Sequence, residues 1–546
     1  MKTRVLQPAF LVVPLVLASC VSPGDTPAWP VHRLEDIDAP DPSGMRRAPA
    51  GAEGAGAAEL ARARLANLAE LALSSEEARA SALTNNLDLK ATLLDPAIAR
   101  EGVTREEARF EAAFTLRAGY QDLDSPTASQ LASAQSTALS VTPGVTIPLR
   151  TGGTATVQLP FAKSDTDNTF ATLNPAYSSD LALSISQPLL RGGGRRAATA
   201  PIAIAAYHAQ AASAVTKLEV IRQLAAVDRA YWRLFAARRA LEVRQQQYEL
   251  ATAQLDKANR LNQSGKAPEI EVIRAEAGLA DRLEAIVRAQ NDLLDRQREL
   301  KRIINLPGLT IETRTLVRTA TLPDPVAYEL DRDVLIASGL SQRMEMLELE
   351  LRLAGDAATI ALEQNNALPL LTLDYTYRVN GLGGSTQDSF HTLGRNRFED
   401  WELGLTAQIP LGNEQAKSRV REALLRRLQR LGTRQARELS IRQEVLAAAD
   451  QLDAAWQRIA AARQSVMLNA RLLAGEQRQF EIGSRTSTDV LDAASKLAEA
   501  QLAEASALSD YQVAQVDLAF ATGTLLGGGK VRLPEAPGDS VRGPRP

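Results

Sequence analysis

Two long stripes of apolar residues at heptad spacing constrain the fold of this chain more than any other feature. The first runs from Val220 to Tyr248, interrupted by Arg238 and Gln245, and the second runs from Ile441 to Phe480. Apolar positions alternately four and three residues apart hold one helix against another as a coiled coil. At about 1.5 Å of rise per residue, such helices extend for several tens of ångströms. They therefore need partner helices, either from the same chain or from other copies of it.

The sequence also contains an internal duplication. Matching positions lie 257 residues apart early in the repeat, then 222 and finally 218: Asp88 and Glu345, Phe114 and Leu371, Tyr120 and Tyr377 at the first offset, Pro188 and Pro410 at the second, Gly265 and Gly483 with Glu271 and Asp489 at the third. The order of the matches is preserved, which favours two copies of one unit. The fall from 257 to 222 makes the segment between the paired strands 35 residues longer in the first copy.

Each copy is expected to hold two strands and two long helices. Apolar residues alternate with other residues around Phe114, Leu183 and Leu405, and this period predicts strands whose length suits a tilted membrane-barrel strand. The first copy also holds LSVTPGVTIPL and GGTATVQLPFA, joined at Gly152 and Gly153. We interpret them as an extra hairpin that lengthens an exposed loop. A hairpin outside any membrane explains these two segments nearly as well.

The N-terminus has the pattern of an export signal. Lys2 and Arg4 precede an apolar run that ends in Leu17-Ala18-Ser19-Cys20. The small residues before Cys20 resemble the lipobox of bacterial lipoproteins, which implies cleavage before Cys20 and attachment of fatty acyl groups such as palmitate. The alternative is an ordinary signal peptide with an incidental cysteine. The absence of aspartate after Cys20 favours sorting to the outer membrane.

These patterns predict six segments. Residues 1–19 are a signal peptide and 20–57 a lipidated flexible tether, rich in proline, glycine and alanine. The first repeat covers 58–305, a linker 306–335, and the second repeat 336–527. Residues 528–546 form a disordered tail.

Composition and motifs argue against several classes of function. Lys and Arg number 62 against 65 Asp and Glu, so the net charge of −3 does not point to nucleic acid as a partner. One cysteine and three histidines make a disulfide framework or a metal site unexpected. No G-x-S-x-G, Walker or H-E-x-x-H motif occurs, and Gly192–Gly194 are followed by two arginines rather than Lys-Ser/Thr. We therefore expect no enzyme, no cofactor and no metal.

Two further motifs carry a family resemblance. QPLL-RGGG (Gln187–Gly194) stands between a strand and a long helix, and FEIGSRTSTDVLDAASKLAEAQ (Phe480–Gln501) forms a helical turnaround. With the duplication, they resemble the TolC-type outer-membrane efflux channel family over about residues 76–526.

The resemblance implies a mixed α/β membrane protein and a homotrimer. Each copy would give four strands to a twelve-stranded β-barrel, and the helices would form a periplasmic α-barrel. Such a channel exports drugs or proteins received from an inner-membrane pump through a periplasmic adaptor. The alternative is a lipid-anchored periplasmic adaptor or scaffold without a pore, although adaptors usually follow their helical hairpin with lipoyl-like and all-β domains.

The turnaround supplies the candidate site. Asp489 and Asp492 are three residues apart on one helix face, so a trimer would stack two carboxylate rings that attract cations. Asp489 alternatively serves as a first-turn carboxylate that stabilises the helix N-terminus.

By resemblance, Arg485 is a gating arginine with Glu271 as its acidic partner, and Phe480 stands where the family often has tyrosine. The alternative is that Arg485 and Glu271 are two solvated charges near a helix end, each contributing little. Gly265 and Gly483 are the turnaround glycines.

Overall fold

The computed structural model describes residues 64–65, 68–127, 133–265, 268–482 and 484–528. All of the elements below belong to the unit of the chain that follows Leu60. The predicted signal peptide, tether, Cys20, Gly483 and residues 529–546 lie outside the described residues.

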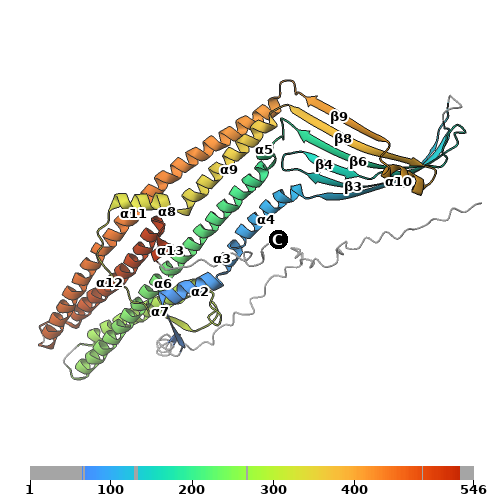
Figure 1. Ribbon diagram of the computed structural model, residues 1–546. Helices are drawn as coiled ribbons and strands as arrows, with labels where there is room; N and C mark the ends of the chain where they lie inside the picture. The colour runs from blue at the N-terminus through green and yellow to red at the C-terminus, as the bar shows by residue number, and fades with distance from the viewer. Residues whose placement is uncertain (1–63, 66–67, 128–132, 266–267, 483, 529–546) are drawn as a thin grey trace, which may run out of the picture. The chain divides into compact units, whose positions relative to one another are not determined.

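The two heptad stripes lie on two very long helices. α6 (Ala200–Gln263) has 64 residues and α11 (Glu414–Glu481) has 68, and each folds back into a second helix, α7 (Glu269–Ile304) or α12 (Ser487–Ala521). The apolar residues of the first stripe are buried from Val220 to Tyr248, which confirms the predicted seam. The second stripe is buried from Ile441 to Ile459, except at the half-buried Ala448, and is half-buried beyond Ile459. Figure 1 shows α6, α9 and α11 side by side, and α6 also packs against α12.

The duplication extends to the structure. β2 (Ala113–Asp124) and β8 (Leu370–Gly383) begin 257 residues apart, as do α3 (Leu87–Thr92) and α9 (Met344–Asn366). The starts of α7 and α12 are 218 residues apart. Elements of the same kind therefore begin at the offsets that the sequence matches predicted. The boundaries of the two repeats stay a prediction.

Shorter elements complete the unit. α2 (Ser75–Asn85) has a capping box between Ser74 and Glu77. The remaining helices are α4 (Asp95–Glu107), η2 (Ala108–Phe110), α5 (Arg195–Ala198), α8 (Arg332–Gln342), α10 (Thr386–Gly394) and α13 (Leu525–Gly528). β1 (Glu70–Leu73) and β7 (Leu316–Thr319) pair as a small parallel sheet. Among the described helices, none is long and apolar enough to cross a bilayer.

The large sheet has seven strands in the order β2-β3-β4-β6-β8-β9, with β5 paired to β3 and β6. Its other strands are β3 (Gln135–Pro148), β4 (Thr154–Gln158), β5 (Phe161–Thr166), β6 (Ala176–Pro188) and β9 (Glu399–Gln408). The interpretation of the hairpin as a lengthened loop is therefore wrong, because β3, β4 and β5 lie in the sheet between β2 and β6. The sheet also has more strands than the four that the resemblance implied.

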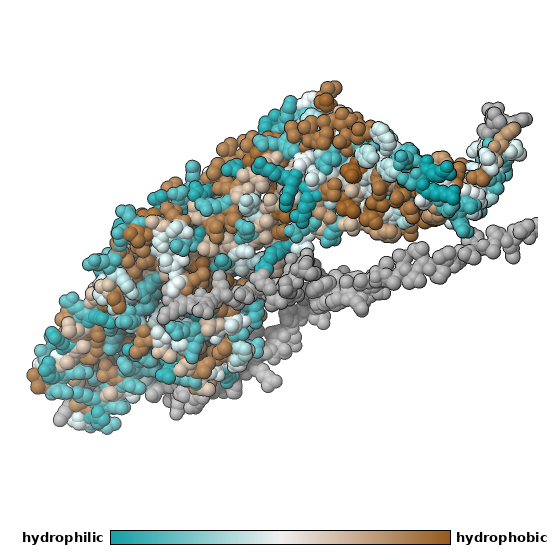
Figure 2. Space-filling view, viewed as in Figure 1, coloured by the Kyte–Doolittle hydropathy of each residue, from teal (hydrophilic) through white to brown (hydrophobic). Residues whose placement is uncertain are grey.

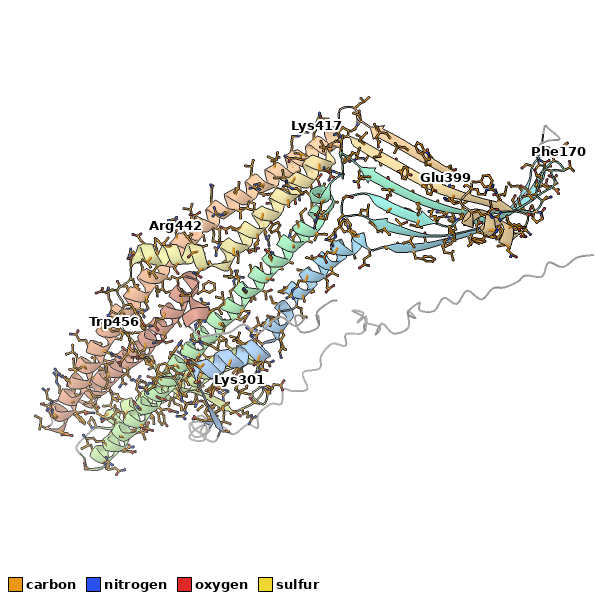
Figure 3. All side chains as sticks on the ribbon, viewed as in Figure 1. Phe170, Lys301, Glu399, Lys417, Arg442 and Trp456 are labelled. Carbon is orange, nitrogen blue, oxygen red and sulfur yellow. The ribbon has the colours of Figure 1, made fainter. Side chains whose placement is uncertain are left out.

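Residues between the repeats are fastened to the helices by buried polar contacts. Nζ of Lys301, labelled in Figure 3, donates to the carbonyls of Thr313 and Thr315 at 2.8 Å each. The Gln297 side chain donates to the Thr315 carbonyl and accepts from the Val317 amide. Burial lowers the pKa of Lys301. Residues 313–317 of the predicted inter-repeat linker are thus held on α7.

Tyr231 ties the same segment to α6. Its ring is fully buried, its hydroxyl donates to the Leu73 carbonyl at 3.0 Å, and it accepts from the Thr321 amide at 2.9 Å. Tyr231→Phe keeps the ring but takes away the acceptor of the Thr321 amide, while the Leu73 carbonyl still accepts from the Ala320 amide. We therefore expect a loss of about 1–3 kcal/mol in unfolding free energy. Chemical denaturation of detergent-solubilised protein measures it. A loss below about 0.5 kcal/mol would mean that water replaces the hydroxyl.

Candidate functional site

The ends of the two helical hairpins lie together, away from the sheet (Figure 1). Ser487 at the start of α12 donates its hydroxyl to Oε2 of Glu271 in the first turn of α7, at 2.7 Å. Gly265, in the first turnaround, has a φ of 73°, in the left-handed region that favours glycine. This hydrogen bond joins the turnarounds of the two repeats.

Asp489 caps its own helix. Its carboxylate accepts from the amide and the hydroxyl of Thr486 at 2.9 Å each, and its amide donates to that hydroxyl at 3.4 Å. These bonds to the backbone and side chain of Thr486 lower the pKa of Asp489. Asp489 therefore stabilises the N-terminus of its helix, as the alternative interpretation of the sequence predicted. Asp492, one turn later on the same helix, is exposed.

Within one chain, Arg485 and Glu271 are not paired with each other. Nε of Arg485 lies 3.3 Å from Glu476 and donates to the Gln479 side chain at 3.2 Å, both on α11. Glu271 instead contacts Ser487 and, at 2.8 Å, Arg274. The Arg485–Glu271 pair is therefore absent from this arrangement of the chain.

Phe480 has a cationic partner that sequence reasoning missed. Nζ of Lys257 on α6 lies 4.1 Å from the centroid of the Phe480 ring on α11, a cation–π contact between the repeats. Ser487 and Glu476 were missed as well. No signal in the sequence pointed to Lys257 and Glu476, because each is one charge among many on a polar helix. For Ser487, the polar turn before α12 was the one available signal. Among the described residues, no three His, Cys, Asp or Glu side chains are grouped so as to hold a metal ion.

The large sheet is amphipathic across its whole width. One register row joins apolar residues on every strand of the path: Phe114, Val145, Val157, Leu183, Tyr377 and Trp401. The adjacent row on the other face is mostly polar or small: Thr115, Gly144, Gln158, Ala182, Arg378 and Asp400. Figure 2 shows hydrophobic residues gathered over these strands. At the two edges, Phe114 and Trp401 are 69% and 68% exposed. α10 covers this face only at its outer end, where Phe390 stacks on Phe161.

Both edges of the sheet are open within the described residues. β2 pairs only with β3, and β9 pairs only with β8. Every neighbouring pair in the sheet is antiparallel. An edge with free amides and carbonyls invites pairing with another strand.

Comparisons with known proteins agree with this architecture. The sequence profile of the outer membrane efflux protein family matches residues 154–306 and 335–524. Outer membrane protein TolC of Vibrio cholerae is 26% identical over 305 residues, which cover 55% of this chain and 67% of that protein.

Solved structures have the same fold. OprN, an outer-membrane channel, superposes with a TM-score of 0.62 at 15% identity, covering 82% of this chain and 90% of its own. The outer membrane protein VceC of Vibrio cholerae gives a TM-score of 0.61 at 14% identity, covering 82% and 96%. The MtrE outer membrane channel of Neisseria gonorrhoeae gives 0.58 at 15% identity, covering 83% and 89%. With profile matches in both halves, which together span more than half of the sequence, this chain belongs to the outer membrane efflux protein family.

Proposed function

We propose that three copies of this chain form a passive channel through the outer membrane. The sheet carries the proposal: it has one apolar face, one polar face and two open edges, as the wall of a pore between lipid and water requires. Lipid would cover the apolar face, and pairing between copies would close the edges. Lipid on Cys20, attached after removal of residues 1–19, would add a second anchor.

The long helices would continue the pore as a tunnel into the periplasm. The hairpin ends would receive a periplasmic adaptor and, through it, an inner-membrane pump. The pump would supply the energy and select the cargo, whether small molecules or secreted proteins. No step in this function requires catalysis by the channel.

The turnarounds would form the gate. The Ser487–Glu271 bond and the Lys257–Phe480 contact hold the two hairpins of one copy together. Opening would swing the inner helices outward about Gly265 and Gly483 as these contacts break. A pair between Arg485 of one copy and Glu271 of a neighbour would add a link between copies.

Asp489 and Asp492 would form two acidic rings at this entrance. In planar bilayers, we expect a trivalent cation such as lanthanum, added on the helical side, to block single-channel current. Hydrogen bonds from Thr486 lower the pKa of Asp489. The Asp489 carboxylate therefore stays charged at mildly acidic pH. Block should therefore persist from about pH 7 to about pH 5.

The double variant Asp489→Asn and Asp492→Asn tests this assignment. We expect it to conduct but to need at least about tenfold more cation for half block, since six charges are removed from a trimer. Glu481→Gln, an exposed change on α11, is the control and should not alter block. Equal block in the double variant and the wild type would remove both aspartates from the entrance.

A further inference from the structure

The inserted hairpin crosses the sheet from one end to the other. β3 has 14 residues and pairs with all 12 residues of β2. On its other side, β4 and β5 follow one unbroken register along β3, from Val145 opposite Val157 to Val141 opposite Phe161. The Leu159 amide donates to the Pro143 carbonyl between them, and only Pro160 interrupts the ladder. β4 and β5 therefore act as one strand, and the sheet has six strand positions.

Side chains of β3 and β4 alternate in phase with the rest of the sheet, and β5 departs from this pattern at Lys163 and Asp165, which lie on the apolar face near its outer end. Apolar residues of the hairpin share the face of Phe114 and Leu183: Leu139, Val141, Val145, Ile147 and Val157. Small and polar residues share the face of Thr115 and Arg378: Ser140, Thr142, Gly144, Thr146 and Thr156. A loop in water gains nothing from such alternation, whereas a strand between lipid and a wet pore requires it.

The turn of this hairpin is built into the helical end of the sheet. Thr151 accepts at its carbonyl from the Gly194 amide at 2.9 Å and donates its hydroxyl to Gln187 at 2.7 Å. Gly152 has a φ of 90°, and a Cβ there would lie 2.0 Å from the Gly192 carbonyl oxygen. The turn thus packs on the connection between β6 and α5. Phe170, in the next connection, lies at the opposite end of the sheet (Figure 3).

We infer that β3 and the β4–β5 strand are wall strands, so that each copy contributes six strands and three copies close a barrel of eighteen. The inference rests on the proposed trimeric channel. Closure would pair β9 of one copy with β2 of the next, which run in opposite directions because the number of strand positions is even. In both edge strands the residues of the apolar row point to the same face of the sheet, so the pairing keeps the lipid face continuous.

A barrel of eighteen strands is wider than one of twelve. Diameter grows roughly in proportion to strand number, so the outer opening would be about one and a half times as wide. The helical tunnel, and not the membrane wall, would then set the largest cargo. The extra 35 residues of the first repeat would serve to widen the barrel.

Electron cryomicroscopy of the full-length protein in lipid nanodiscs tests the strand count directly. We expect three copies around a closed barrel of eighteen strands, with β3 between β2 and the β4–β5 strand. A closed trimeric barrel of twelve strands, with residues 133–167 outside it, would overturn this inference and leave the proposed channel standing. Trimers without a closed barrel would overturn both.

A pair of neighbouring substitutions tests the same point without a map. Val141→Lys places a charge on the apolar face near the middle of β3, and Ser140→Lys places it on the polar face of the same strand. We expect at least a tenfold lower yield of folded, membrane-inserted protein for V141K and a yield within twofold of wild type for S140K. Equal yields of the two variants, high or low, would show that the strand does not separate lipid from water.

Discussion

Arg343→Met is expected to cost about 3 kcal/mol of unfolding free energy, because it leaves the buried carboxylate of Glu345 and the partly exposed one of Glu444 short of a partner. The Arg343 side chain is only 3% exposed, at the start of α9. It pairs with Glu345 at 2.6 Å and with Glu444 of α11. Arg437 pairs with the same two carboxylates at 3.0 and 2.9 Å. Because Arg437 remains to pair with both carboxylates, we expect the loss of unfolding free energy to lie at the lower end of the range of about 3–5 kcal/mol for broken buried pairs.

The pKa values of this cluster give a second signature. Burial raises the pKa of Glu345, but hydrogen bonds and charge from Arg343 outweigh it, so the folded pKa lies below the usual 4.5. A carboxyl with a lowered folded pKa contributes stability above its unfolded pKa and loses it as the pH falls through the folded value. The cost of R343M should therefore shrink below about pH 4.

Denaturation of the solubilised protein, followed by far-UV circular dichroism, measures the cost. Arg426→Ala is the matched control, since its pair with Glu422 is exposed and worth at most about 0.5 kcal/mol. Adding Glu444→Gln to R343M should recover part of the loss, because Arg437 then faces one carboxylate instead of two. Equal stability of the two single variants would mean that the cluster does not fasten α9 to α11.

The double variant Leu425→Glu and Leu428→Glu is expected to abolish the proposed trimer. Both leucines lie on α11 and are 64% and 63% exposed. They point away from α9, which α11 contacts through Arg427 and Arg430 instead. With Leu439, they form an apolar stripe that has no neighbour within the described part of the chain. A neighbouring copy would cover this stripe, and six buried glutamates per trimer could not be accommodated.

Light scattering of detergent-purified protein measures the assembly state. Wild type and Arg426→Ala should give the mass of three chains, and the double variant should give mainly single chains. Trimers of the double variant with unchanged stability would show that this face of α11 is not an interface between copies.

Patterns that repeat along the chain could be predicted, and contacts between distant residues could not. The seam from Val220 to Tyr248 follows from heptad spacing alone, because neighbouring turns of one helix face decide it. The cap at Asp489 follows in the same way from local sequence, since Thr486 stands three residues before it. In contrast, Arg343 and Glu444 are 101 residues apart and neither has a local signature.

For the strands of the hairpin too, the sequence predicted the local structure but not the contacts with distant residues. The two segments joined at Gly152 and Gly153 were correctly predicted to form a hairpin. Alternation does not say which strands a hairpin lies between, because pairing joins residues far apart in sequence. The resemblance favoured four wall strands per copy, so the extra segment was assigned to a loop. Only the ladder from β2 through β3 to β6 places it in the sheet.

Conduction is the central claim, and single-channel recording in planar bilayers tests it most directly. Wild-type trimers should give discrete current steps. Glu271→Ala removes the bond from Ser487 and should raise the open probability about fivefold, as expected from the loss of about 1 kcal/mol from the closed state. Glu269→Ala, an exposed change in the same turn, should behave as wild type. Folded trimers of the wild type and of E271A that both give no current above the bare bilayer would contradict the account.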